Sequence, residues 1–263
     1  MSSLVTKVRL RQIEALLEKN KRIDERGLLE TREIKIEQGL IEKAEGSARV
    51  LLGKTEVLVG VKVETGEPFP DTPNDGVMTV NAELVPLASP NFEPGPPDEN
   101  SIELARVVDR GIRESHAINT EKLCIEPGKK VFVVFVDVYV LNHDGNLIDA
   151  SAIAAMAALM NTKMPNYELK DGELKIKQGY TPLPMKSHPV TVTVCKINNK
   201  LLVDPGLEEE SVMDSRITFA TNEEGNICAI QKGGSGFFTP QQILEALKIA
   251  LEKAVELRKK FNW

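Results

Sequence analysis

Residues 93–113 read EPGPPDENSIELARVVDRGIR, and a change of pattern inside this stretch organises the rest of the chain. The segment 93–97 contains three prolines, which lack amide donors and fix φ, so it predicts a rigid loop. Asn100 and Glu103 then stand at the spacing of a capping box and predict the start of a helix. Residues near helical spacing predict its buried face: Ile102, Ala105, Val108 and Ile112.

Three arginines follow a second line along this helix and form what we call the basic stripe: Arg106, Arg110 and Arg113. Acidic residues lie three or four positions from an arginine: Glu103, Asp109 and Glu114. The stripe therefore fits an ordinary salt-bridged helix face. It also fits a phosphate-binding ridge, because the planar fork of arginine matches phosphate oxygens. The helix alone leaves both interpretations open.

The composition is that of a globular protein and argues against an independent nucleic-acid-binding protein. The chain has 263 residues, of which 41% are hydrophobic and 27% charged, enough for a sizeable core in one large domain or two small ones. Its net charge is −6, whereas affinity for nucleic acid comes largely from Lys and Arg. Contact with RNA is expected only at a local patch or beside a more basic partner.

The sequence predicts no metal site and no cofactor. It has three cysteines and three histidines: Cys124, Cys195, Cys228, His116, His143 and His188. Neither set has the spacing of a disulfide framework or of metal ligands. The N-terminus lacks the apolar core of a signal peptide, and no window approaches a membrane span, so we expect a soluble, cytoplasmic protein.

Two β-branched runs, at 48–52 and 56–63, flank Gly53-Lys54-Thr55 and predict a hairpin. The triplet is not a P-loop, because Ala48 stands where that motif needs a glycine and a strand follows it. Residues 130–141, KVFVVFVDVYVL, predict a strand buried on both faces.

The alanine-rich residues 148–160 predict a helix packed closely against a sheet. Thr239 and Pro240 begin a last helix, with Gln242 completing a capping box. The apolar spacing of that helix runs through Ile243, Leu247, Leu251 and Leu257.

The remaining elements complete an α+β pattern. A helix is predicted at 5–19, a hairpin turn at 171–172, and strands at 32–38, 77–85, 190–197, 201–204, 213–220 and 227–231. The alternating charges of RIDERG, residues 22–27, suit an ordered salt-bridged corner or a plain charged loop, with Gly27 supplying positive φ. The order of elements fits one domain of two similar mixed-sheet halves, 1–128 and 129–263, and not a doubly wound sheet.

The densest acidic segment is Glu208-Glu209-Glu210 with Asp214. Converging carboxylates there would hold Mg²⁺ or act as acid and base, but the composition favours a solvated acidic turn after Asp204-Pro205. The turn 144–146 either presents amides to an anion at the start of the alanine helix or is an ordinary turn.

Taken together, these segments resemble the RNase PH family of phosphorolytic exoribonucleases. The matching stretches are RIDERG at 22–27, GSARVLLGKTEVLVGV at 46–61, SIELARVVDRGIR at 101–113, DVYVLNHDGNLIDASAIAAMAAL at 137–159 and the acidic strand near Asp214. They fall in family order. Within the family, the run at 72–110 is most similar to the non-catalytic ring subunit of the archaeal exosome. The resemblance implies an RNase PH fold of two βαβ-type halves and a ring assembly.

The chain departs from the active members of the family at three places. Where those members carry an Arg-Arg pair, it has Glu99-Asn100. Where they have Gly, Thr or Ser followed by a phosphate-binding arginine, it has Asn146, Leu147 and Ile148. Where they have two aspartates six residues apart, it has Glu208 and Asp214.

Phosphorolysis brings two anions together, so cations must hold the attacking phosphate. With those cations lost, the resemblance implies no catalytic residue in this chain, and Glu208 with Asp214 would form a vestigial acidic site. Because function depends on the site and not on the fold, we give the loss of these cations more weight than the catalytic activity of the family.

The resemblance further implies a structural and RNA-positioning subunit. Three copies would alternate with three copies of a catalytic RNase PH-like paralogue in a hexameric ring, with RNA-binding cap subunits on one face. The paralogue would use inorganic phosphate. Arg106 and Arg110 would bind phosphates of the RNA 3′ end. Arg113 also matches a position of the family, but the resemblance does not imply that it is an RNA ligand. The alternatives are an active phosphorolytic or metal-dependent 3′-to-5′ exoribonuclease that uses Asp214 and Glu208, and a free-standing RNA-binding module.

Overall fold

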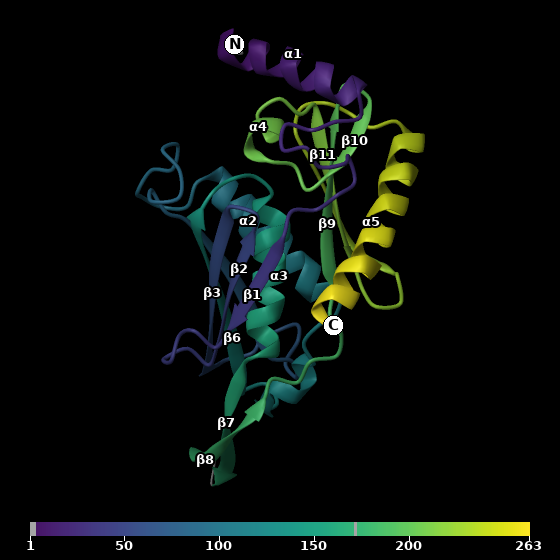
Figure 1. Ribbon diagram of the computed structural model, residues 1–263. Helices are drawn as coiled ribbons and strands as arrows, with labels where there is room; N and C mark the ends of the chain where they lie inside the picture. Colours follow the sequence, from purple (N-terminus) through teal and green to yellow (C-terminus); the bar gives the residue numbers. More distant parts are fainter. Residues whose placement is uncertain (1–3, 171–172) are drawn as a thin grey trace.

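The computed structural model describes residues 4–170 and 173–263, in which two main β-sheets flank one central helix (Figure 1). The first sheet has the order β1-β2-β3-β6-β4, with β5 against β6, and the second has the order β10-β9-β11-β12. The strands of the first sheet are β1 Ile34–Gln38, β2 Gly46–Leu52, β3 Thr55–Gly66, β4 Val77–Leu84, β5 Cys124–Glu126 and β6 Lys130–Asn142. Those of the second are β9 Val190–Ile197, β10 Lys200–Val203, β11 Ser215–Thr221 and β12 Ile227–Gly233.

The first sheet confirms one expectation from the sequence and corrects another. The β2–β3 hairpin around Gly53 is confirmed, and β4 pairs with β6 in parallel across a helical connection. Burial along β6 alternates between buried and half-buried residues. The expectation that β6 is buried on both faces is therefore wrong, because helix α3 covers one face of this sheet and the other face is only partly covered.

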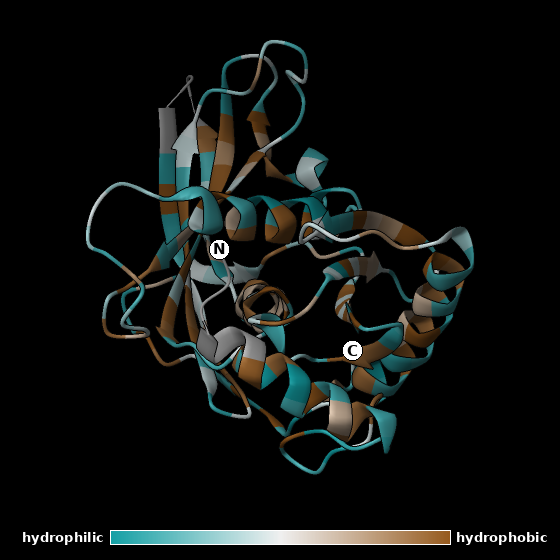
Figure 2. Cartoon of the chain, turned by 90° about the horizontal axis from the view of Figure 1, so that it is seen from above, coloured by the Kyte–Doolittle hydropathy of each residue, from teal (hydrophilic) through white to brown (hydrophobic). Residues whose placement is uncertain are grey.

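Helix α3, Leu147–Met160, lies between the sheets and is buried around nearly its whole circumference. It packs against β2 and β3 on one side and against β9 on the other. In Figure 2, α3 is seen nearly end-on at the centre of the molecule and is brown through most of its length, as expected for a core helix. The contact is very close, since a Cβ on Gly46 would lie 2.5 Å from the carbonyl oxygen of Ala158. The prediction of a small-residue helix against a sheet is confirmed.

Helix α2, Glu99–Arg113, starts slightly earlier than its sequence predicts. Asp98 is the N-cap, because its Oδ1 accepts from the amide of Ser101, while Asn100 donates its side-chain amide to Asp98. The predicted cap at Asn100 is therefore wrong. The buried face is shifted as well, since Ile102 is 48% exposed. The buried apolar residues are Leu104, Val107, Val108 and Ile112.

The second sheet is antiparallel throughout and is covered by helix α5, Pro240–Phe261. The predicted capping box of Thr239 and Gln242 is confirmed. The predicted apolar line is wrong at its start, where Ile243 is 37% exposed. Small residues form most of the buried face instead, because they let the helix approach β9 and β11 closely: Ala246, Ile249, Ala250, Ala254 and Leu257.

The remaining elements lie at the two ends of the molecule in Figure 1. They are α1 Leu4–Glu18, the 3₁₀ helix η1 Thr120–Leu123, the hairpin strands β7 Lys163–Lys170 and β8 Glu173–Pro182, and the short helix α4 Leu207–Glu210. Helix α1 packs Ile13 and Leu17 into a small cluster with residues of β9 and β10. The hairpin β7–β8 projects from the opposite end, and its predicted turn at 171–172 lies outside the described residues.

The α+β fold is confirmed. The boundary between the two sheets does not lie at the expected position after residue 128. Because β6 ends at Asn142, the first sheet extends past residue 128, and the second begins only at Val190. Whether the two parts fold as one domain stays a prediction. No helix in the described part of the chain is long and apolar enough to cross a membrane.

Candidate functional site

A cavity of about 300 Å³ opens where the first turns of α2 and α3 meet β9, α4 and β11, and we call it the α2–α3 cavity. Its polar lining includes Glu103, His143, Asn146, Glu210 and Arg216, and its apolar lining includes Phe92 and Ile148. Phe92 stacks on His143 with ring centroids 5.4 Å apart. Burial lowers the pKa of His143, so its ring is neutral at neutral pH.

The turn before α3 brings a carboxylate to the start of that helix. Gly145 has φ +89°, and a Cβ there would lie 2.5 Å from the backbone of Gly206, so the turn requires glycine. Asn146 follows in the left-handed region, and its amide donates to Glu210 Oε1 at 2.8 Å. The anion at the N-terminus of α3 is therefore a side chain of the protein itself. Burial raises the pKa of Glu210 to about 7, although this hydrogen bond and nearby arginines oppose the shift.

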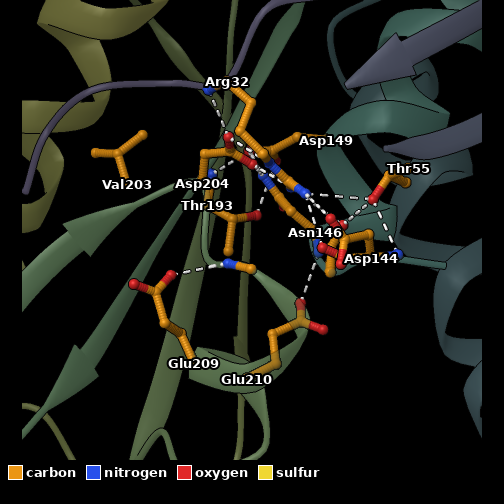
Figure 3. Close-up of polar contacts among 12 residues, drawn as sticks. Arg32, Thr55, Asp144, Asn146, Asp149, Thr193, Val203, Asp204, Glu209 and Glu210 are labelled. Carbon is orange, nitrogen blue, oxygen red and sulfur yellow. Dashed lines mark hydrogen bonds and ion pairs between the residues drawn. The ribbon is translucent and has the colours of Figure 1, made fainter. Parts of the chain in front are cut away.

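Behind the cavity, a buried polar network joins the two sheets (Figure 3). Asn146 Nδ2 donates to Asp149 Oδ2 at 2.8 Å and to Asp204 Oδ1 at 2.9 Å. Arg32 lies over Asp204 and holds it with two side-chain hydrogen bonds of 2.6 and 2.9 Å. Burial alone would raise the pKa of Asp204, but the hydrogen bonds and charge of Arg32 outweigh it and lower that pKa.

The pKa of Asp149 shifts in the opposite direction from that of Asp204. Three donors approach its carboxylate, from Asn146 Nδ2 and from the amide and hydroxyl of Thr193. Burial nevertheless raises the pKa of Asp149 to about 7, and the negative charge of Asp204 adds to that shift. The network thus holds one ionised carboxylate and one that titrates near neutrality.

The RIDERG segment is an ordered salt-bridged corner. Arg22 is 2% exposed and donates to both oxygens of Glu209, at 2.8 and 2.5 Å, and to the carbonyl oxygens of Val203 and Asp204 at 2.8 Å each. Arg26 reaches Asp204 at 3.0 Å. The expectation that Gly27 supplies positive φ is wrong, because Glu25 takes that conformation.

The basic stripe divides into one paired arginine and two free ones. Arg113 binds Asp109 at 2.6 Å and the carbonyl oxygen of Met78 at 2.9 Å. Arg106 and Arg110 are exposed and make no ion pair or hydrogen bond within the described chain. Glu103, expected beside them, binds Arg216 at 2.8 Å instead. The salt-bridged interpretation therefore holds for Arg113 only.

Arg106 and Arg110 face a shallow groove of about 320 Å³ on the surface of the molecule. The same groove is also lined by Glu99, Ile102, Glu103, Val107 and Gln231. The two guanidinium groups thus have an open surface in front of them, and within the described chain neither carboxylate of the groove forms an ion pair with them. Their role toward RNA stays a prediction.

The structure separates the acidic residues that were expected to act together. Glu208 is exposed, 4.0 Å from Arg9, and Asp214 is exposed and accepts from the amide of Asn198. The two share no hydrogen bond, and the residue of this segment that reaches the cavity is Glu210. Among residues 4–170 and 173–263, no group of three or more His, Cys, Asp or Glu is placed to hold a metal ion. The vestigial role of Glu208 and Asp214 stays a prediction.

Sequence reasoning missed three residues of this region, Arg32, Asp204 and Arg216, and it named Glu210 only as part of the acidic segment. The sequence offered one local signal, because Asp204 directly precedes a proline. In the structure Asp204 adopts φ +52°, a conformation that non-glycine residues seldom take. The pairing of Arg32 with Asp204 spans 172 residues, and no local pattern announces it.

Comparisons with known proteins agree with this fold. Residues 30–165 match the model of domain 1 of the 3′ exoribonuclease family, RNase PH, and residues 187–253 match domain 2. The exosome complex component Rrp42 of Thermococcus gammatolerans is 60% identical over 246 residues, covering 93% of this chain and 90% of that protein. Its counterpart in Methanopyrus kandleri is 50% identical over 257 residues, covering 97% and 96%.

Two solved structures extend the likeness to three dimensions. A chain of the Archaeoglobus fulgidus exosome with RNA bound to the active site superposes with a TM-score of 0.91 at 52% identity, covering 98% of this chain and all of that one. A chain of an archaeal exosome core gives a TM-score of 0.87 at 48% identity, covering 99% and 98%. The chain matches the models of both family domains in their order along the sequence. It therefore belongs to the 3′ exoribonuclease (RNase PH) family.

Proposed function

We propose that this chain is a non-catalytic ring subunit of an archaeal exosome, which positions RNA for a catalytic RNase PH-like paralogue. The names of its relatives support membership of the complex, because proteins 50–60% identical over nearly their whole length are exosome components. Three copies would alternate with three copies of the paralogue, with RNA-binding cap subunits on one face of the ring. Such a complex would act in the cytoplasm.

The observation that best supports the non-catalytic role is the hydrogen bond from the backbone amide of Asn146 to the carboxylate of Glu210. A phosphorolytic site needs positive charge where the attacking phosphate binds, and a helix N-terminus is a natural place for it. Here that N-terminus already holds an acidic side chain. Ile148 stands where active members carry the phosphate-binding arginine, and the cavity's own Arg216 is paired with Glu103. Inorganic phosphate would therefore meet repulsion in this cavity and would be used by the paralogue.

The basic stripe supports the positioning role. Arg106 and Arg110 lie on the surface and outside the α2–α3 cavity, so they are suited to an RNA strand whose reactive end sits in another subunit. Arginine contacts to phosphates fix the register of a strand without reading its sequence. Such contacts suit a subunit that guides RNA of any sequence toward a neighbouring active site.

The first experiment is a phosphate-dependent RNA degradation assay on this chain alone, on the catalytic paralogue alone and on the assembled pair. The product to measure is nucleoside diphosphate. We expect no release by this chain alone and greater release by the pair than by the paralogue. Release by this chain alone would replace the proposal with the second candidate, an active phosphorolytic or metal-dependent 3′-to-5′ exoribonuclease that uses Asp214 and Glu208.

A single substitution is expected not to restore catalysis. Ile148→Arg should leave nucleoside diphosphate release by this chain undetectable, because Glu210 still occupies the amide of Asn146 and Glu99-Asn100 still replace the arginine pair. The measurement is phosphate-dependent turnover by the purified variant, with its melting temperature recorded to confirm folding. Turnover by this variant would refute the explanation given for the silent cavity.

A further inference from the structure

Glu103 lies where an ion pair with Arg106 is expected, and the structure engages its carboxylate elsewhere. The two residues are three positions apart on α2, a spacing at which acidic and basic side chains of a helix commonly pair. Arg216 of β11 instead donates through Nη2 to Glu103 Oε2 at 2.8 Å, and Gln231 of β12 donates to Oε1 at 3.4 Å. Both carboxylate oxygens therefore accept hydrogen bonds from the second sheet.

The Arg216–Glu103 pair is better shielded from water than a pair with Arg106 would be. The side chains of Arg216 and Glu103 are 20% and 32% exposed, whereas Arg106 belongs to the exposed residues of α2. The Arg216 guanidinium also packs closely on Gly233, where a Cβ would lie 2.8 Å from Nε. Because water weakens ion pairs at exposed positions, Glu103 favours Arg216 over Arg106.

The other carboxylate within reach of Arg106 is also engaged by a different arginine. Asp109 lies three positions further along α2, and Arg113 donates to both of its oxygens, at 2.6 and 3.0 Å. The carbonyl oxygen of Met78 in β4 anchors Arg113 at 2.9 Å. Both acidic neighbours of Arg106 on the helix thus have other partners, and Arg106 forms no ion pair with the described residues.

We propose that Arg216 is a positioning residue for RNA binding, which holds Glu103 away from Arg106 and so leaves the charge of Arg106 uncompensated at the groove. The proposal rests on the proposed role of Arg106 toward RNA phosphates. Without Arg216, Glu103 would pair with Arg106 and would compete with an RNA phosphate for the same guanidinium. Glu99, the other carboxylate of the groove, is seven positions before Arg106, beyond the spacing at which helix side chains pair.

The experiment compares the assembled ring carrying Arg216→Gln with the ring carrying Arg216→Gln and Glu103→Gln together. The measurement is the dissociation constant for single-stranded RNA at low ionic strength. Arg216→Gln should weaken binding about threefold, because the released Glu103 pairs with Arg106. The double variant should return to the wild-type constant, because the competing carboxylate is gone. The matched control Arg9→Gln removes an arginine from an exposed ion pair on α1 and should leave binding unchanged.

The double variant separates positioning from two other roles for Arg216. If Arg216 bound RNA itself, or only tied α2 to β11, the double variant would bind RNA as weakly as the single variant, and the proposal would fail. The slope of affinity against salt should also decrease by up to about 0.7 in the single variant, for one lost phosphate contact, and recover in the double variant. A wild-type dissociation constant for Arg216→Gln would overturn the proposal as well.

The role of Arg216 and the role of the basic stripe can be told apart with one more variant. The ring carrying Arg106→Glu and Arg110→Glu tests the stripe directly. If that ring binds RNA weakly while the Arg216→Gln ring binds it normally, the stripe contacts RNA but Arg216 does not control it. If the charge-reversed ring binds RNA as tightly as the wild-type ring, both proposals are refuted.

Discussion

Reversing the charges of Arg106 and Arg110 together is expected to lower RNA binding and degradation by the assembled ring at least tenfold. Each charge-assisted hydrogen bond to phosphate contributes ~1.5–3 kcal/mol, and glutamate at both positions would add repulsion. Neither arginine forms an ion pair with the described residues, so we expect the substitutions to leave the fold and the assembly of the ring intact. The measurements are the dissociation constant for single-stranded RNA and the rate of nucleoside diphosphate release.

The matched control is Lys259→Glu with Lys260→Glu, the same change in net charge at exposed positions near the end of α5. It should leave RNA binding nearly unchanged. The salt dependence of binding gives an independent measure, because each lost phosphate contact reduces the slope for single strands by about 0.7. A ring carrying Arg106→Glu and Arg110→Glu that degrades RNA at the wild-type rate would remove the basis for the positioning role.

Arg22→Ala is expected to cause the largest loss of stability. Arg22 and Glu209 are both buried, and removing one partner of a buried ion pair leaves an uncompensated charge, at a cost of ~3–5 kcal/mol. For a chain of this size the melting temperature should fall by about 6–20 °C. Thermal unfolding followed by circular dichroism measures the change. The surface control Arg9→Ala removes an exposed pair and should cost less than ~1 kcal/mol.

A second variant separates lost charge pairing from lost packing. Arg22→Met combined with Glu209→Leu removes both charges and keeps much of the side-chain volume, so it should recover part of the stability lost in Arg22→Ala. If the single substitution melts within about 2 °C of the wild-type chain, the Arg22–Glu209 pair does not hold the corner as described.

The elements of the fold were predictable from local pattern, whereas the site was predictable only in part. The β2–β3 hairpin, the alanine helix α3 and the capped start of α5 each follow from spacing within a few residues. The start and buried face of α2 were displaced, because Asp98 competes successfully with Asn100 for the N-cap position. Local pattern cannot rank two candidate caps of similar strength that lie two residues apart.

The interior contacts were beyond local reasoning. Arg22 meets Glu209 across 187 residues and Arg32 meets Asp204 across 172, and such pairings depend on how the two sheets come together. The resemblance supplied the family and the lost cations, but it directed attention to Glu208. The structure places Glu210 in the cavity, since the short helix α4 turns the two side chains in different directions.

The salt-bridged corner also has a consequence for synthesis of the protein. Arg22 leaves the ribosome early, but its partner Glu209 is added 187 residues later, which at ~5–20 residues per second is a delay of about 10–40 s. Helix α3 likewise needs β9 to cover its second face. The Arg22–Glu209 contact therefore cannot form until most of the chain has been made, so the nascent chain acquires its full interior only when nearly complete.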